Sequence, residues 1–104
     1  MDAVFKALAD PTRRRLLDRL RAKNGLTLSE LCEHAEMTRQ AVTKHLAILE
    51  AANLVATQKE GRMKRHWLNP VPINEIADRW IGKYERPRLR ALGELKKNLE
   101  AENE

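Results

Sequence analysis

The sequence predicts a mostly α-helical domain that carries one small β-hairpin. Apolar residues recur every three or four positions along most of the chain, which is the period of a helix with one buried face. The 4 prolines and 4 glycines separate these helical stretches. One strand-like segment contains a glycine where the chain can turn back. A chain of 104 residues has the size of one domain, so we expect residues 1–104 to form a single unit.

The first two helices are predicted from their apolar spacing and from a start signal between them. Residues 2–9 form a short helix candidate with Val4, Phe5 and Leu8 on one side. Asp10 followed by Pro11 then starts a longer helix, because Asp accepts backbone N–H bonds and Pro suits the first helical position. We expect that helix to reach about residue 23 and to end at residues 24–25.

The next two helices are short and lie close together in the sequence. Thr27 and Glu30 fit a capping box, in which each side chain satisfies a free backbone N–H at a helix start. A brief break at residues 36–37 follows, and Thr38 caps another helix that runs to about Ala52. Residues 28–52 therefore predict a helix-turn-helix.

Residues 54–69 predict a hairpin, which we call the wing. Residues 54–59 and 65–69 read as two strands, and Gly61 between them tolerates the positive φ of a tight turn. The stretch 69–72 contains two prolines and interrupts regular structure. Two helices are expected after it, over 73–83 and about 86–101, with a kink near Pro87.

The helix over 39–52, which we call the recognition helix, has two chemically different faces. At about 100° per residue, Val42, Leu46 and Leu49 form one stripe suited to the core. The residues on the opposite face are polar or small, and they are Gln40, Thr43, Lys44 and Ala47. An α-helix fits the major groove of B-DNA when a second helix braces it across the backbone. Two helices with a tight break, followed by a basic hairpin, are the pattern of a winged helix-turn-helix.

The side chains on the polar face have the chemistry that reads base edges. Gln40 suits adenine, and Lys44 suits guanine. Thr43 suits either a thymine methyl group or a phosphate. Arg39, near the start of the helix, is better placed for phosphate, and the capping residue Thr38 is a further candidate DNA contact. A solvated helix face is the alternative interpretation.

The wing and the second helix add positive charge. The wing carries Lys59, Arg62, Lys64 and Arg65 against Glu60. Such a ribbon can follow the DNA backbone or enter a minor groove, and Lys59, Arg62 and Lys64 are our candidate contacts, with Arg62 at the tip. The alternative is a charged edge that prevents aggregation. The arginines of residues 13–23 either touch phosphate or form a solvated face.

The order of these motifs resembles the ArsR/SmtB family of bacterial repressors. The similar segments are Ala7 to Arg13 with Leu16 and Leu17, Met37 to Leu46 with Leu49, and Gly61 with Arg62. The resemblance covers roughly residues 3–69, and the last helices match only in placement. It implies a homodimeric winged-helix repressor that binds an inverted repeat. It also implies that the first and last helices form the dimer interface.

A leucine strip in the last helix points to the same interface. Leu89, Leu92, Leu95 and Leu99 recur at three- and four-residue spacing, as in a helix-pairing seam. Residues Val4, Phe5 and Leu8 of the first helix would complete the seam. Packing of these residues on the chain's own core is the alternative.

Metal binding and catalysis are not predicted. The family's leading cysteine position falls at Thr27, and residues 70–104 contain no histidine for the family's second metal site. Cys32 and His34 are two apart, so a helix points them in different directions, and Cys32 is expected in the core. His45 is expected behind the recognition helix, with no neighbouring carboxylate arrangement that suggests catalysis. We therefore expect no enzyme, no metal and no cofactor.

The composition favours a DNA partner. The net charge is +5 and the isoelectric point is about 9.7, which suits nucleic acid. An aromatic content of 4% argues against base stacking on single strands. One cysteine, no long apolar run and no signal-like start indicate a cytoplasmic protein without a membrane partner.

The sequence thus predicts a regulator of transcription, a homodimeric repressor that binds double-stranded DNA at an inverted repeat through the major groove. A winged-helix module that docks protein instead of DNA is the alternative function. An unidentified small-molecule inducer, a protein partner and constitutive repression all stay open.

Overall fold

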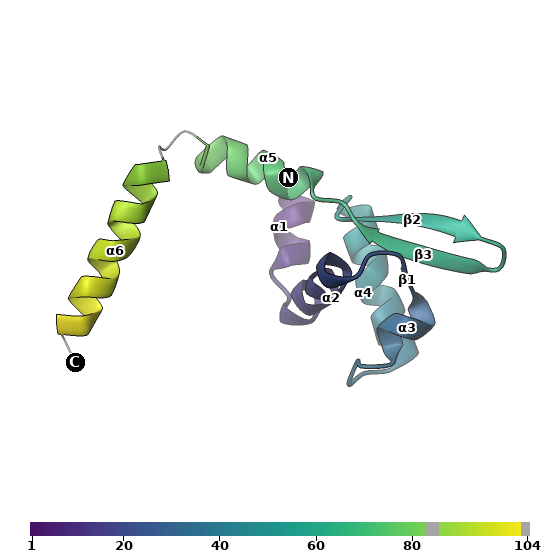
Figure 1. Ribbon diagram of the computed structural model, residues 1–104. Helices are drawn as coiled ribbons and strands as arrows, with labels where there is room; N and C mark the ends of the chain where they lie inside the picture. Colours follow the sequence, from purple (N-terminus) through teal and green to yellow (C-terminus); the bar gives the residue numbers. More distant parts are fainter. Residues whose placement is uncertain (83–85, 103–104) are drawn as a thin grey trace. The chain divides into compact units, whose positions relative to one another are not determined.

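The computed structural model describes the backbone of residues 1–82 and 86–102, and the side chains of residues 1–82 and 90–100. Helices dominate it, and a small sheet accompanies them (Figure 1). The elements are α1 (Asp2–Leu8), α2 (Pro11–Ala22), β1 (Leu26–Thr27), α3 (Leu28–Cys32), α4 (Arg39–Ala51), β2 (Val55–Glu60), β3 (Met63–Leu68), α5 (Val71–Trp80) and α6 (Arg86–Glu102). The predicted fold class, a mostly helical winged helix-turn-helix, is confirmed.

Three helices begin at the predicted caps. At the start of α2, the backbone N–H of Arg13 donates to Asp10 Oδ2 at 3.0 Å. At α3 the capping box is closed, since Glu30 N donates to Thr27 Oγ1 at 3.2 Å and Thr27 N donates to Glu30 Oε1 at 3.1 Å. At α4 the Thr38 hydroxyl accepts from Ala41 N at 3.1 Å. These local bonds fix where each helix starts.

The core lies between α1, α2, α3 and α4 and is made almost entirely of aliphatic side chains. Its α4 members are the predicted stripe Val42, Leu46 and Leu49, all buried. The helix ends at Ala51, and Asn53 shortly after it has a φ of +62°, a left-handed conformation that closes a helix C-terminus. The α3 helix is shorter than predicted: it ends at Cys32, before the break expected at residues 36–37.

The sheet has three strands where the sequence predicted two. The strand order is β1-β3-β2, all antiparallel, with Leu26 opposite His66. A two-residue strand is too short to show alternation in the sequence, so β1 was not predicted. The β3 strand begins at Met63 because Gly61 and Arg62 alone make the turn between Glu60 and Met63.

The α5 helix starts earlier than predicted. It begins at Val71, inside the stretch expected to be irregular, because Asn69 Oδ1 accepts from Val71 N at 3.2 Å and caps it. Pro72 sits in the first turn, where its missing N–H costs nothing. The α6 helix covers the predicted range. The kink expected near Pro87 stays a prediction, because residues 83–85 just before α6 lie outside the described residues.

The chain divides into two compact units, Met1–Ile73 and Asn74–Glu104. The second unit is mainly α5 and α6, whose large apolar side chains are mostly exposed. Among the described residues, no helix is long and apolar enough to cross a membrane.

Candidate nucleic-acid interface

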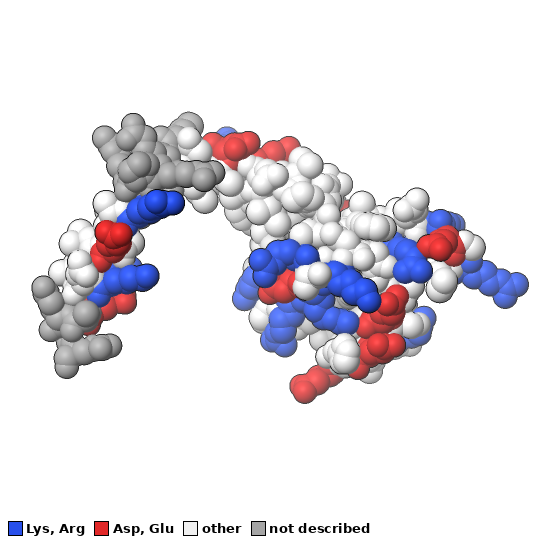
Figure 2. Space-filling model, in the orientation of Figure 1, with Lys and Arg blue, Asp and Glu red and all other residues white. Residues whose placement is uncertain are grey.

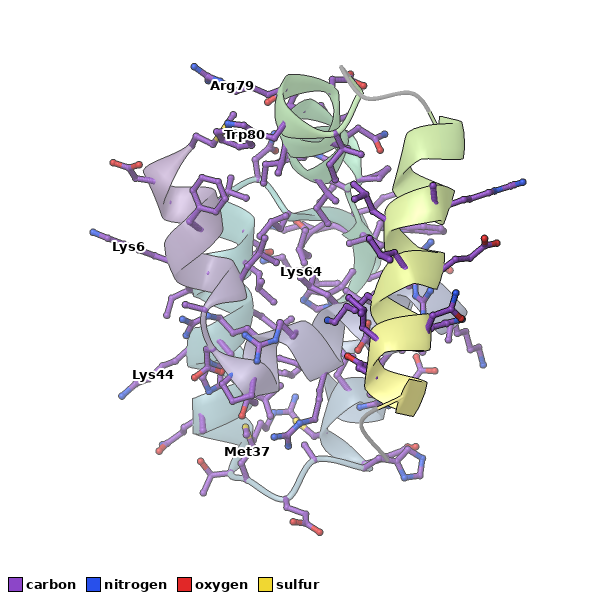
Figure 3. The ribbon with its side chains drawn as sticks, turned by 90° about the vertical axis from the view of Figure 1, so that its left-hand side faces the viewer. Lys6, Met37, Lys44, Lys64, Arg79 and Trp80 are labelled. Atoms are coloured by element: carbon purple, nitrogen blue, oxygen red, sulfur yellow. The ribbon has the colours of Figure 1, made fainter. Side chains whose placement is uncertain are left out.

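The outward face of α4 carries the predicted base-reading residues. Gln40, Thr43 and Lys44 are exposed, while the opposite stripe of the same helix is buried. Lys44 points away from the helix into open space (Figure 3). Ala47 is exposed on the same face, and its small side chain leaves room for close approach. The face is therefore free to meet a partner.

Hydrogen bonds on this face narrow the role of Thr43. Its hydroxyl donates to the carbonyl oxygen of Arg39 at 2.9 Å, one turn back along α4. Because this proton is already used, Thr43 offers its methyl group rather than a hydrogen bond to phosphate. Arg39 itself is exposed, and its Nη1 makes a long contact of 3.4 Å with Ser29 Oγ. Arg39, Gln40, Thr43 and Lys44 line a shallow depression on α4.

The four cations of the wing separate into two kinds. Lys59 and Arg62 are exposed and make no ion pair within the described residues. In contrast, Lys64 Nζ lies 3.0 Å from Glu50 Oε1 on α4. Arg65 Nε donates to Glu60 Oε2 at 2.6 Å. Lys64, which the sequence suggested as a DNA contact, is thus exposed but paired with a carboxylate of α4.

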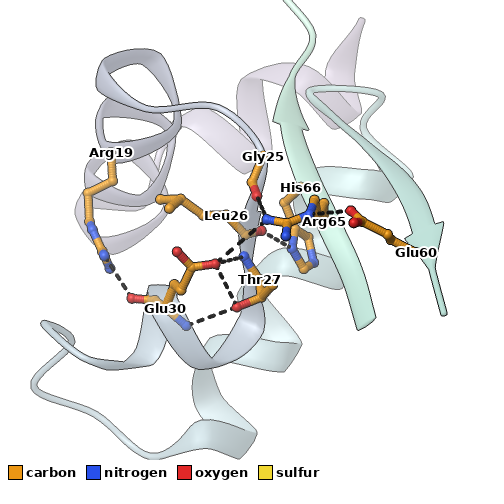
Figure 4. A network of polar contacts seen from close by, with 8 residues as sticks. All are labelled: Arg19, Gly25, Leu26, Thr27, Glu30, Glu60, Arg65 and His66. Atoms are coloured by element: carbon orange, nitrogen blue, oxygen red, sulfur yellow. Dashed lines mark hydrogen bonds and ion pairs between the residues drawn. The ribbon is translucent and has the colours of Figure 1, made fainter. Parts of the chain in front are cut away.

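Arg65 is the centre of a polar network that the sequence analysis did not find (Figure 4). Its Nη1 donates to the carbonyl oxygen of Gly25 at 2.9 Å and lies 3.9 Å from Glu30 Oε1. The hydrogen bond and charge of Glu60 raise the pKa of Arg65. The backbone and hydroxyl hydrogen bonds from Thr27 hold the pKa of Glu30 below its usual value. Both shifts favour the charged forms of Glu30 and Arg65.

Several α2 arginines cap the ends of other helices, which was neither of the two roles considered for them. Arg13 donates from Nε to the carbonyl oxygen of Ala7 at 2.8 Å, and Arg14 donates to that of Leu8 at 2.6 Å. Arg19 donates to the carbonyl oxygens of Glu30 and Leu31 in α3. Helix C-termini leave carbonyls unpaired, so these guanidinium groups satisfy them. Lys and Arg also gather over α2 and towards the tip of the wing (Figure 2).

His66, His45 and Cys32 contact groups of the fold and do not form a metal or catalytic cluster within the described residues. His66 is buried, and its Nδ1 lies 2.9 Å from the carbonyl oxygen of Leu26. His45 is half-buried. A carboxylate lies near it that the sequence analysis did not expect, since Asp10 Oδ2 is 4.0 Å from His45 Nδ1. That carboxylate caps α2, and the N–H of Arg13 lowers its pKa. Cys32 is half-buried rather than in the core, and no group of three metal-binding side chains occurs in the described part.

The predicted dimer residues differ in how exposed they are. In α6, Leu92, Leu95 and Leu99 are 62%, 54% and 52% exposed, and the side chain of Leu89 lies outside the described residues. In α1, Phe5 is 43% exposed and Leu8 is half-buried, but Val4 is buried. Val4 therefore packs on the chain's own core, which was the alternative for the first helix.

The fold and the site together define a class of protein. A helix-turn-helix supports an exposed polar helix face, and a basic hairpin follows it, so the chain is a winged helix-turn-helix DNA-binding regulator. Comparison with known proteins agrees, since residues 8–58 match the family model of a helix-turn-helix domain.

Curated relatives and a solved structure narrow the class to a family. An uncharacterised HTH-type transcriptional regulator of Bacillus subtilis strain 168, YuzN, is 42% identical over 86 residues, covering 77% of this chain and 94% of YuzN. The transcriptional repressor SdpR of the same strain is 32% identical over 75 residues, covering 72% of this chain and 82% of SdpR. An ArsR-like transcriptional regulator from Rhodococcus sp. RHA1 superposes with a TM-score of 0.71 at 32% identity, covering 96% of this chain and 90% of that one. The chain belongs to the ArsR/SmtB family of winged helix-turn-helix transcriptional regulators.

Proposed function

We propose that this protein is a homodimeric repressor that binds an inverted-repeat operator. The observation that carries the proposal is the free polar face of α4, opposite its buried stripe. That face lies in the major groove, and α3 braces it across the DNA backbone. Occupation of a promoter then blocks transcription, and the similar SdpR is named a transcriptional repressor.

Each side chain of the interface has a role that follows from its chemistry and its free groups. Gln40 and Lys44 contact base edges, and Thr43 presents its methyl group to thymine. Thr38 and Arg39 meet phosphates at the start of α4. The free wing cations, Lys59 and Arg62, meet phosphates beside the groove.

The exposed leucines of α6 support the homodimer. Leu92, Leu95 and Leu99 share a helix face and are each more than half exposed, although leucine is among the residues most often buried. Pairing with a second copy removes this surface from water. A dimer then presents two α4 helices to half-sites about 34 Å apart. Sedimentation equilibrium of the full chain tests this step, and a mass of one subunit at micromolar concentration contradicts it.

Selection of bound duplexes from a random pool tests the DNA-binding step. The expected winners have two-fold symmetry, and their affinity falls steeply with salt because phosphate contacts release counterions. With the selected duplex, Lys44→Ala is expected to weaken binding by roughly tenfold or more. Lys97→Ala removes the same charge from α6, none of whose residues is a proposed DNA contact, and serves as the control. No enriched duplex, or equal losses for both variants, contradicts the proposal and favours a protein-docking module.

A further inference from the structure

The wing has little apolar packing to hold it in place. Every residue from 56 to 64 is exposed, so more than half of the hairpin has no buried side chain. Its ladder to the rest of the sheet consists of the two residues of β1. A two-stranded hairpin is marginally stable by itself. Polar links from the base of the wing must therefore contribute to its orientation.

Arg65 provides such a link in two directions. Towards the tip, its Nε donates to Glu60 Oε2 at 2.6 Å. Towards the helix-turn-helix, its Nη1 donates to the carbonyl oxygen of Gly25 at 2.9 Å. The fork of a guanidinium group holds both partners at once, which a lysine ammonium at the same site does not reproduce.

The network continues into the start of the first helix of the helix-turn-helix. Glu30 Oε1, which lies 3.9 Å from Arg65 Nη1, is the same oxygen that accepts from Thr27 N and Thr27 Oγ1 to close the capping box. Thr27 also lies opposite Arg65 in the β1–β3 ladder. The start of α3 and the base of the wing thus share one carboxylate and one guanidinium group (Figure 4).

We propose that Arg65 is a positioning residue, which holds the wing at a fixed orientation to the helix-turn-helix so that the free cations at its tip reach the DNA backbone. The inference deepens the proposed function and rests on it. Arg65 itself does not contact DNA. Its side chain is 33% exposed, and its guanidinium group is occupied by Glu60 and Gly25. Lys59 and Arg62, in contrast, are exposed and make no ion pair among the residues that the structure describes.

Conservative variants separate positioning from direct contact. A phosphate contact survives Arg→Lys with most of its affinity, because the charge remains. We expect Arg62→Lys to bind the selected duplex almost as well as the wild type. Arg65→Lys keeps the charge but loses the fork, and we expect it to weaken binding by roughly tenfold. Wild-type affinity for Arg65→Lys would overturn the proposal.

A double-mutant cycle asks whether Arg65 acts through the wing. The double variant Lys59→Ala, Arg62→Ala lacks the tip contacts that Arg65 is proposed to position. In that background the loss caused by Arg65→Lys should shrink to about twofold, whereas an independent contact gives the same loss in both backgrounds. Equal losses in the two backgrounds would show that Arg65 binds DNA directly.

Glu60 gives a test in which simple attraction and positioning predict opposite signs. Glu60→Gln removes a negative charge from the wing, so charge alone predicts tighter DNA binding. If Glu60 holds Arg65, the specific complex becomes weaker instead. Glu33→Gln, at the exposed position directly after α3 and outside the network, is the matched control for the charge. Tighter binding for both variants contradicts the proposal.

Hydrogen exchange of the free protein separates failure of this inference from failure of the proposed function. The backbone amides of the β2–β3 ladder should exchange faster in Arg65→Lys, while those of α4 stay protected. Unchanged exchange in the ladder overturns the positioning role even if the wild type binds DNA. If the wild type binds no duplex, the DNA-binding proposal fails, and the part of this inference that concerns Arg62 and Lys59 fails with it.

Discussion

The recognition helix and the wing are held in place by different forces. The α4 helix buries Val42, Leu46 and Leu49 in the core, so its polar face is oriented by packing. The wing is exposed over residues 56–64, and it is oriented by a short ladder and by the polar contacts of Lys64 and Arg65. Packing is stiff and non-directional, whereas the polar links depend on a few atoms. A single substitution should therefore disturb the two regions in different ways.

The largest expected effect is the loss of the packing beneath α4. Leu49 is fully buried, so Leu49→Ala leaves a cavity and should lower the free energy of unfolding by about 2–5 kcal/mol. Its neighbour Ile48 is 43% exposed, and Ile48→Ala is the control, with a smaller loss expected. Urea denaturation followed by circular dichroism measures both. Equal losses would mean that α4 does not rest on this stripe.

This difference also explains which parts of the structure the sequence could predict. The caps Asp10, Thr27 and Thr38 act on residues three positions away, so their signals are local and were read correctly. The stripe of α4 follows from helical periodicity alone. The exposed face with Gln40 and Lys44 follows from the same periodicity, because it is the other side of one helix.

The polar links of the wing join residues that are far apart in the sequence. Arg65 reaches the carbonyl oxygen of Gly25, 40 positions earlier, and no local pattern indicates that pairing. The same holds for β1, because its two residues become a strand only by pairing with β3. The sequence selected Lys59, Arg62 and Lys64 as candidate contacts, and only the fold separates Lys64, which is paired with Glu50, from the other two.

The turn at the tip of the wing gives the second largest effect. Gly61 has a φ of +62° with open space around it, so an added methyl group meets no neighbour but strains the backbone. Gly61→Ala should destabilise the hairpin by about 1 kcal/mol. Gly93→Ala, also in open space but inside α6, should have the opposite sign, since alanine favours a helix by about 1 kcal/mol over glycine.

Thermal unfolding and far-ultraviolet circular dichroism of the two glycine variants check this pair. A lower midpoint is expected for Gly61→Ala, and a higher helical signal is expected for Gly93→Ala. Loss of stability in both variants would contradict the backbone explanation for Gly61.

Acid should weaken the helix caps. The folded-state pKa values of Asp10 and Glu30 are lowered, first of all by the N–H groups of Arg13 and Thr27. Their stabilising effect is present above the unfolded pKa of about 4, and it is lost as the pH falls through and below that value. Asp10→Asn keeps a capping oxygen but removes the titration, so its stability should depend less on pH between about 5 and 2. If the stability of Asp10→Asn depends on pH as much as that of the control Asp18→Asn, titration of the Asp10 cap is not the cause of the acid effect.

The smallest effect is expected for the ion pair between the wing and α4. Glu50 Oε1 is shielded from solvent and lies 3.0 Å from Lys64 Nζ, in a geometry that supports an ion pair but not a well-aligned hydrogen bond. Both side chains are partly exposed, so a double-mutant cycle of Lys64→Ala and Glu50→Gln should give a coupling of about 0.2–1 kcal/mol. The more exposed pair Lys96 and Glu100, at 4.0 Å within α6, should give less. A coupling for Lys64 and Glu50 no larger than for that pair would show that this ion pair does not help to hold the wing against α4.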